Sequence, residues 1–169
     1  MKAIASRALG AIDGLQRTAF ALASASVAVL LGLMLLEVFR RYVLGSPSIW
    51  SYEAVGIVNG AVFVLAAGYA LQTGGHVAVD AATRFMPVRL RDALVGIFNV
   101  AGLAPVLAYV AQAGFARTLT AFARGEVDDV SPWRHVVWPH YGLFSVGLAL
   151  FALAALAAGL RQLASARDG

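Results

Sequence analysis

The sequence predicts an all-α integral membrane protein with four transmembrane helices, and three observations support this. Of the 169 residues, 60% are hydrophobic and only 13% are charged, about half the charged fraction of an average soluble domain. The mean hydropathy is +0.78. The apolar residues form four runs without Lys, Arg, Asp or Glu, each close to the roughly 20 helical residues that cross a hydrocarbon core about 30 Å thick.

The four spans follow one another with short connections between them. They are expected at residues 18–36, 54–72, 93–116 and 136–160. No connection is long enough for a separate globular unit, which needs about 50 residues to bury a core. We therefore expect one four-helix membrane domain over residues 1–169. Inside the third span, Pro105 removes one backbone hydrogen bond and predicts a kink.

The first span has an alternative interpretation. Residues 1–25 carry Lys2, Arg7 and Arg17 ahead of an apolar run with an Ala-Ser-Ala segment, as in a cleaved secretory signal peptide. The apolar run continues well beyond these small residues, which favours a helix that is retained.

The distribution of Lys and Arg predicts the orientation of the bundle. An even number of spans places both termini on one side. The cations on that side are Lys2, Arg7, Arg17, Arg84, Arg89, Arg91, Arg161 and Arg167. Those on the other side are Arg40, Arg41, Arg117, Arg124 and Arg134. Because cytoplasmic connections carry the excess of positive charge, both termini are expected in the cytoplasm. The same scattered cations form no basic stripe, so we expect lipids and proteins as partners and no nucleic acid.

The second connection has an amphipathic pattern. Residues 74–87 begin with a Gly-Gly break and end in a proline, and Asp80 and Arg84 form an i, i+4 pair on a helix. Two interpretations stay open for this segment. It is either a short interfacial helix of about three turns or an irregular loop with an incidental apolar stripe.

No constellation of catalytic residues is visible. The absence of cysteine excludes disulfides, thiolate metal sites and cysteine nucleophiles. His76 is expected on the cytoplasmic side, whereas His135 and His140 are expected at the outer end of the fourth span, so they are not placed to share a haem or metal ion. No phosphate-binding glycine loop or nucleophile elbow occurs. We therefore expect a protein that is not an enzyme and binds no cofactor.

Few polar residues interrupt the spans. Glu37 ends the first one, and Arg40 or Arg41, three and four residues later, can neutralise it. Three amides lie deeper: Asn59, Asn99 and Gln112. Amides in membrane helices commonly hydrogen-bond between helices, at about 0.6 kcal/mol on average, and we expect that role here. So few polar groups make a poor channel or pump, which favours a subunit of a larger assembly.

The first connection joins two antiparallel spans and carries several polar residues. A Gly-Ser-Pro turn follows Arg41, and Trp50 and Glu53 follow the turn. The hairpin brings Arg41 near Glu53, so we expect a cross-helix ion pair, with Trp50 at the headgroup level. The alternative is two separately solvated interfacial charges, because exposed ion pairs contribute little.

This stretch resembles the small membrane subunit of the tripartite ATP-independent periplasmic (TRAP) transporters. The family ends its first span with Arg-Tyr-Val and continues with an aromatic and acidic pattern, as do Arg41, Tyr42, Val43, Pro47, Trp50 and Glu53 here. Its second connection opens with a Gly-Gly-His-hydrophobic-x-hydrophobic-Asp segment, matched by Gly74, Gly75, His76, Val77, Val79 and Asp80. At Tyr52 the family commonly has a first glutamate, so a role that needs two carboxylates is not expected.

The resemblance implies a non-catalytic subunit in the bacterial inner membrane. A periplasmic binding protein would deliver an organic acid to a large membrane subunit, which binds sodium and carries the acid inward by an elevator movement. The small subunit would buttress the large one. Glu37, Arg41, Trp50, Glu53, His76, Asp80 and Arg84 are the structural and interface candidates. Two other readings remain: a self-assembling small channel or exporter, and a membrane anchor for an oxidoreductase, which the histidine placement disfavours.

Overall fold

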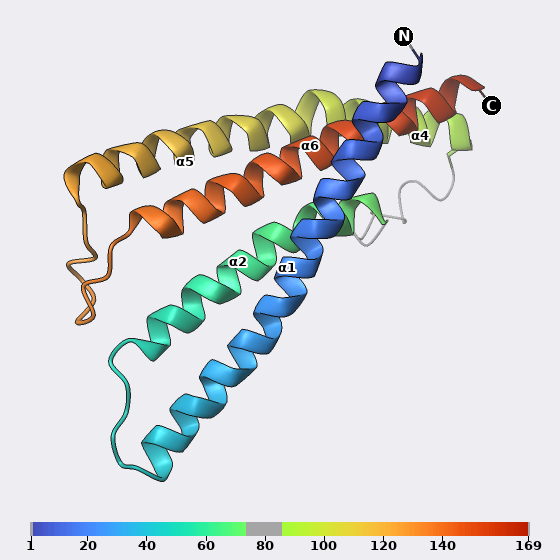
Figure 1. Cartoon of the computed structure of the whole chain (residues 1–169). Helices are drawn as coiled ribbons and strands as arrows, with labels where there is room; N and C mark the ends of the chain where they lie inside the picture. Colours follow the sequence, from blue (N-terminus) through green and yellow to red (C-terminus); the bar gives the residue numbers. More distant parts are fainter. Residues whose placement is uncertain (1, 74–85, 169) are drawn as a thin grey trace.

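The computed structural model describes residues 2–73 and 86–168, which form helices and two connections between them (Figure 1). The helices are α1 (Lys2–Tyr42), α2 (Ser51–Gln72), α4 (Val88–Ile97), the π-helix η1 (Phe98–Leu103), α5 (Ala104–Arg124) and α6 (Trp138–Asp168). Four segments are long and apolar enough to cross a membrane: Arg7–Tyr42, Ser51–Gln72, Val88–Arg124 and Trp138–Arg167. The predicted all-α membrane fold with four spans is confirmed.

The helices are longer than the predicted spans, most of all at the start of α1. Its 41 residues extend over about 61 Å at 1.5 Å per residue, about twice the thickness of a hydrocarbon core. A run without charged residues predicts only the part of a helix that lies in lipid. The helix itself can continue beyond that part, because Ala, Leu, Arg and Lys are all good helix formers. The segment 74–85, with the expected interfacial helix, lies outside the described residues.

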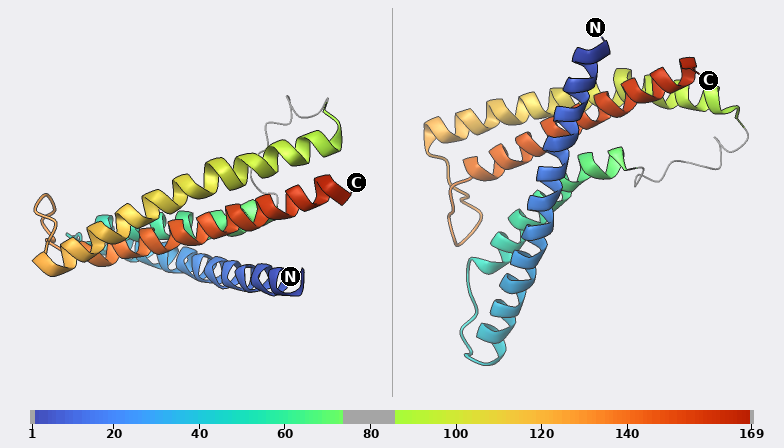
Figure 2. Two further views of the ribbon diagram at one scale, coloured as in Figure 1. Left: turned by 90° about the horizontal axis from the view of Figure 1, so that it is seen from above. Right: turned by 45° about the vertical axis from the view of Figure 1, so that its right-hand side comes forward.

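α6 lies at the centre of the bundle and contacts α5, α2, α4 and α1. The helices form two antiparallel pairs, α1 with α2 and α5 with α6, and both chain termini lie at the same end (Figure 1). α1 crosses α6 near the termini and diverges from α5 and α6 towards its other end (Figure 2). α1 therefore packs mainly on α2 and leaves most of its surface uncovered.

Small residues allow α6 to approach its neighbours closely. Three alanines of α6 are completely buried: Ala154, Ala155 and Ala157. A Cβ added to Gly147 would lie 2.7 Å from Val64 Cβ on α2, and one added to Gly159 would lie 2.9 Å from the Gly96 carbonyl oxygen on α4. In lipid, burial of apolar surface gives no driving force for helix association. Helices associate there through the van der Waals contacts that a close approach of their backbones allows.

Two buried amides connect helices that are distant in the sequence. Gln16 Nε2 on α1 donates to the Leu150 carbonyl of α6 at 2.6 Å. Asn99 Nδ2 donates to Gln162 Oε1 at 2.9 Å, as expected of a helix-to-helix hydrogen bond. For Asn59 and Gln112 the same expectation is wrong within this chain, because both are exposed and neither hydrogen-bonds to a described residue.

The irregularity expected at Pro105 is a π-helical turn. η1 ends two residues before the proline, which is the second residue of α5, and joins α4 to α5 in one continuous helical segment. The Ala104 N–H reaches back five residues to the Asn99 carbonyl, as in a π-helix. The wider turn accommodates a proline that has no N–H to donate and places Asn99 against α6.

Candidate functional site

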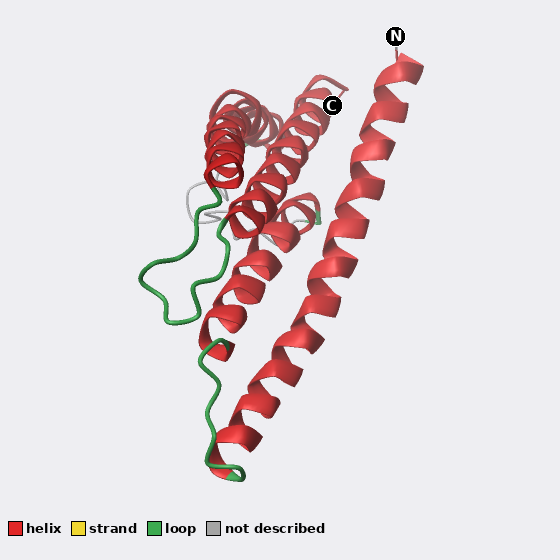
Figure 3. Cartoon of the chain, turned by 60° about the vertical axis from the view of Figure 1, so that its left-hand side comes forward, coloured by secondary structure: helices red, strands yellow, loops and turns green. Residues whose placement is uncertain are grey.

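Polar side chains gather at the end of the bundle away from the chain termini. The α1–α2 connection (residues 43–50) and the α5–α6 connection (residues 125–137) both lie there (Figure 3). We call this the connection end and the opposite end, where both termini lie, the terminal end. At either end the helices leave the hydrocarbon, so charged groups are tolerated there.

The α5–α6 connection folds back on itself as a short hairpin, which we call the connection hairpin (residues 125–137). Gly125 ends α5 in the left-handed conformation, with φ at +61°, which glycine adopts without steric cost. Val127 and Val136 then form an isolated antiparallel bridge. Two backbone hydrogen bonds flank the bridge: Asp128 N–H to the His135 carbonyl at 2.9 Å and Val137 N–H to the Glu126 carbonyl at 3.2 Å.

Glu53, near the start of α2, contacts the connection hairpin. Its Oε1 accepts a hydrogen bond from the Ser131 hydroxyl, and its Oε2 lies 3.3 Å from His135 Nδ1. The His135 side chain is only 12% exposed and stacks on Trp133 with ring centroids 4.8 Å apart. Trp133 in turn lies 6.4 Å from the Trp50 ring. One carboxylate and an aromatic stack thus join α2 to the α5–α6 pair.

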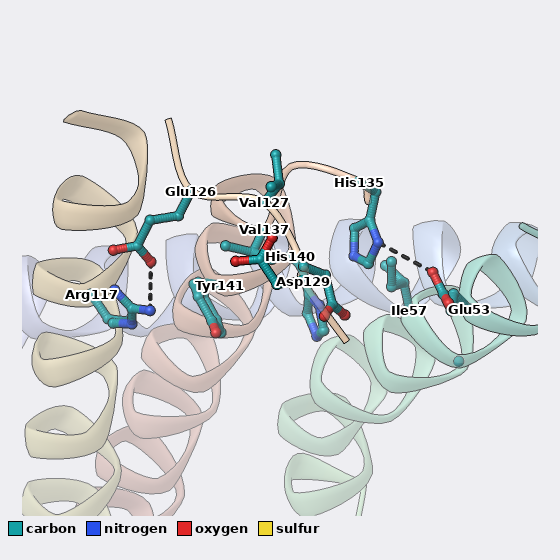
Figure 4. Close-up of a pocket in the computed structure, with 12 residues that line it drawn as sticks. Glu53, Ile57, Arg117, Glu126, Val127, Asp129, His135, Val137, His140 and Tyr141 are labelled. Atoms are coloured by element: carbon teal, nitrogen blue, oxygen red, sulfur yellow. Dashed lines mark ion pairs between the residues drawn. The ribbon is translucent and has the colours of Figure 1, made fainter. Parts of the chain in front are cut away.

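A second contact joins the connection hairpin to α5. Arg117 lies 2.6 Å from a Glu126 carboxylate oxygen and covers the Tyr141 ring at 5.2 Å (Figure 4). The hydrogen bond from Arg117 holds the pKa of Glu126 below its ordinary value of 4.5, against an opposing effect of burial. Glu126 therefore contributes to the stability of the folded hairpin while it is ionised.

We expect acid to loosen the connection hairpin through Glu126. Because its folded pKa lies below 4.5, its contribution is fully present above pH 4.5 and is lost as the pH falls through the folded value. Hydrogen exchange at residues 125–137, corrected for intrinsic rates, should accelerate in that window. Glu126→Gln should exchange faster at neutral pH and lose this acid-dependent step; an unchanged step would contradict the assignment.

A cavity of about 360 Å³ lies between these two contacts, lined on one side by α2 and on the other by the hairpin, α5 and α6 (Figure 4). Its charged lining is mixed, and Glu53, Arg117, Glu126 and His135 already contact one another in the two pairs above. Among residues 2–73 and 86–168, no group of three or more His, Asp or Glu is arranged to hold a metal ion. The arrangement therefore fixes the connection hairpin against α2 and α5.

The predicted ion pair between Arg41 and Glu53 is wrong. Arg41 pairs within its own helix, at 3.0 Å from Glu37 Oε1, as the i, i+4 spacing allowed. The other Glu37 oxygen accepts the Ser48 N–H at 3.1 Å, so this carboxylate also holds the α1–α2 connection. Glu53 is not within reach because it lies on the face of α2 that meets the connection hairpin.

The other predicted residues are divided between the described and the undescribed parts of the chain. Trp50 and Glu53 both belong to the site at the connection end. His76, Asp80 and Arg84 lie outside the described residues. The sequence interpretation missed the partners on the hairpin, Ser131 and His135, and the anchor Arg117. Of these three, only Ser131 lies in the polar run "RGEVDDVSPW" (residues 124–133) between two apolar spans. That run marks a connection without indicating its fold.

Comparison with known proteins gives one match. A family model described as "Tripartite ATP-independent periplasmic transporters, DctQ component" matches residues 30–165. No curated protein and no solved structure matches significantly. The matched range contains α2, α4, η1 and α5 and most of α6, together with both connections at the connection end.

Proposed function

This chain belongs to the DctQ component family of the tripartite ATP-independent periplasmic transporters, and on that premise we propose that it buttresses a large transport subunit. The large subunit would bind sodium and carry an organic acid, and a periplasmic binding protein would deliver that acid to the assembly. The chain itself would be non-catalytic and would bind no cofactor. It would lie in the bacterial inner membrane with the terminal end in the cytoplasm, in keeping with the distribution of Lys and Arg.

The observation that carries the buttress proposal is a pair of exposed amides within the spans. Asn59 lies about 12 Å along α2 from its first residue at 1.5 Å per residue, and Gln112 lies well inside α5. Both are exposed, and neither has a hydrogen-bond partner in the described part of the chain. An amide without partners is costly in hydrocarbon, so a polar group of another protein is needed beside it.

Exposed hydroxyls on α1 and α5 behave differently. Ser24 and Ser26 each donate to the carbonyl four residues earlier on α1, at 2.9 Å, and Thr120 does so on α5 at 3.0 Å. These residues are satisfied within their own helices and need no partner. Asn59 and Gln112 differ from these hydroxyls because they lack a described partner. We therefore infer that a second protein covers these two positions.

The surroundings of both amides suit a packed helix. On α2, Asn59 stands in an exposed stripe with Tyr52, Gly56 and Phe63. Gln112 borders a groove of about 640 Å³ between α5 and α6. The groove is lined largely by small residues, among them Ala104, Ala108, Ala111, Ala149 and Ala152. Small residues permit the close approach by which membrane helices pack.

Affinity purification from native membranes in mild detergent tests the proposal. We expect a large multi-span membrane protein to accompany this chain in stoichiometric amount, and sodium-dependent uptake of an organic acid to require both. Recovery of the chain alone as a homo-oligomer that conducts ions in liposomes would instead support a self-assembling channel.

Removal of the exposed amides should weaken the assembly. With Asn59→Leu and Gln112→Leu combined, we expect recovery of the large subunit to fall several-fold, since hydrogen bonds between membrane helices contribute up to about 1.7 kcal/mol each. Ser24→Ala is the matched control, because that hydroxyl bonds only to its own helix. Equal recovery for the double variant and the control would contradict the assignment of these positions to the interface.

A further inference from the structure

A second polar pocket lies at the terminal end, between the first part of α1 and the end of α2. Its volume is about 190 Å³, and its lining is Asp13, Arg17, Tyr69, Gln72, Thr73 and Arg161. At roughly 30 Å³ per water molecule, it holds about six waters, which is more room than a phosphate group needs. The residues come from α1, α2 and α6 and the residue after α2, so the fold brings them together from distant parts of the chain.

The single acidic residue of this pocket is already neutralised. Both carboxylate oxygens of Asp13 lie 2.7 Å from one Arg161 nitrogen. The same nitrogen lies 3.4 Å from the Leu9 carbonyl oxygen. Asp13 and Arg161 therefore compensate each other, and the positive charge that remains in the pocket belongs to Arg17.

Three donor groups of the pocket have no hydrogen-bond acceptor among residues 2–73 and 86–168. The Arg17 guanidinium and the Tyr69 hydroxyl have no polar partner among the described residues. Gln72 Nε2 is shielded from solvent and also lacks one. Tyr69 is held in place by stacking on Phe20, with ring centroids 4.3 Å apart. A buried donor without a partner costs free energy, which an acceptor in the pocket would recover.

The end of α2 does not oppose an anion strongly. Helix C-termini carry partial negative charge on their last carbonyl groups. Here the Thr73 hydroxyl lies 3.1 Å from the Tyr69 carbonyl oxygen and 3.4 Å from that of Ala70, and the Thr73 N–H also bonds to carbonyls of the last turn. These contacts cover the carbonyls nearest the pocket.

The pocket lies where two spans leave the hydrocarbon. The uncharged run of α1 begins directly after Arg17, and α2 ends at Gln72. Phe20, which stacks on Tyr69 of the pocket lining, is 41% exposed, so apolar surface adjoins the polar lining. A lipid headgroup would contact the polar lining of the pocket, and the acyl chains of the lipid would contact the adjoining apolar surface.

We propose that this pocket binds a phosphate group, carried either by a phospholipid headgroup or by a soluble phosphate. Arg17 supplies the charge-assisted contact, and Gln72 and Tyr69 supply neutral donors. Arginine suits this role because its planar fork of donors matches phosphate oxygens. The proposal is independent of the transport function and concerns only this chain.

Native mass spectrometry of the purified full-length chain, titrated with phosphatidylglycerol in nonionic detergent, tests the proposal. We expect one lipid to be retained per chain and Arg17→Gln to weaken this binding about tenfold, equivalent to about 1.4 kcal/mol. Gln72→Leu should weaken it less. Arg17→Lys should retain most of the binding because it keeps the charge. Arg17 makes no hydrogen bond or ion pair with a described residue, so its variants are expected to fold.

Controls decide between specific binding and general attraction. Arg89→Gln removes another exposed arginine near the same end and should leave binding unchanged. Equal loss in Arg89→Gln and Arg17→Gln, or full binding by Arg17→Gln, would overturn the proposal. Displacement of the lipid by millimolar inorganic phosphate would assign the site to a soluble phosphate, and retention would assign it to a headgroup.

Discussion

Replacement of Gly159 by leucine is expected to destabilise the isolated chain by about 3 kcal/mol, near the upper end of what overpacking costs. A Cβ at this position would lie 2.9 Å from the Gly96 carbonyl oxygen and 2.7 Å from Val100 Cγ2. The backbone of a helix cannot move aside as a side chain can, so α4 and α6 must separate. Reversible unfolding by SDS in mixed micelles measures the change.

Two further variants make this prediction specific. Gly159→Ala should lower the free energy of unfolding by less than Gly159→Leu does. It should still be destabilising, because its Cβ alone comes too close to the Gly96 carbonyl oxygen. Gly32→Leu is the matched control, since nothing lies within 4 Å of a Cβ at Gly32 and leucine has the higher helix propensity. A Gly159→Leu chain as stable as the Gly32→Leu chain would show that α4 and α6 are not in such close contact.

Separation of α4 from α6 should also break the hydrogen bond between Asn99 and Gln162. Asn99 Cβ would itself lie 3.0 Å from a Cβ added at Gly159, so the amide is in the path of the new side chain. A buried amide that loses its partner costs about 1–3 kcal/mol. Gly159→Leu combined with Asn99→Leu is therefore expected to lose less than the sum of the two single effects.

The membrane fold could be predicted from the sequence because hydropathy and charge act over whole spans. The second span, expected at residues 54–72, is α2 at Ser51–Gln72. The start of α1 could not be placed in the same way. Residues 2–17 form helix although they include charged residues, so hydropathy does not mark where the helix begins. The central position of α6 could not be predicted from the sequence either. Alanine-rich runs occur in several spans, and only the structure shows which of them are buried.

The connection end was harder to predict because its contacts join distant segments. Local spacing offered Arg40 and Arg41 as partners of Glu37, and the structure pairs Glu37 with Arg41, four residues away on the same helix. The partner of Glu53 is His135, and the separation between them includes two spans and their connections. Proximity across the first hairpin suggested Arg41 instead. An ion-pair prediction from one hairpin fails when a second connection folds over the same face.

Polar residues of this chain therefore fall into two groups with different consequences. Asn99 donates to Gln162 and Glu53 accepts from Ser131, so both residues bond inside the chain and fix its own helices and connections. Asn59 and Gln112 are exposed on the outer surface and have no hydrogen-bond partner among the described residues. Substitutions in the first group should alter the stability of the isolated chain, whereas those in the second should alter assembly and leave that stability nearly unchanged.

Glu53→Leu is expected to release the connection hairpin from α2. The leucine cannot accept the Ser131 hydroxyl or contact His135 Nδ1, and both partners would remain largely buried, Ser131 at 8% exposure and His135 at 12%. A loss of about 1–3 kcal/mol follows from the Ser131 hydroxyl, which loses its acceptor. The His135 ring nitrogens make no hydrogen bond to a described residue even with Glu53 in place. Glu53→Gln should lose less, because its amide oxygen still accepts from Ser131. The exchange of Arg41 and Glu53 should restore nothing, since Arg41 pairs with Glu37.

The absence of cysteine in the chain permits a direct measurement of this release. Spin labels on Ile49→Cys and Val130→Cys, at positions 68% and 95% exposed, would report the distance between the two connections. A narrow distribution should broaden in Glu53→Leu. Asp129→Asn, which removes only a solvent-exposed pair with Arg134, should leave it narrow.

The same variants separate local structure from transport. If the connection end presents part of the surface on which the binding protein docks, uptake by the complete transporter should fall in Glu53→Leu and persist in Asp129→Asn. A broadened distance with normal uptake would mean that the hairpin is not needed for docking. An unchanged distance would contradict the role of Glu53 itself, because no other described carboxylate accepts from the Ser131 hydroxyl.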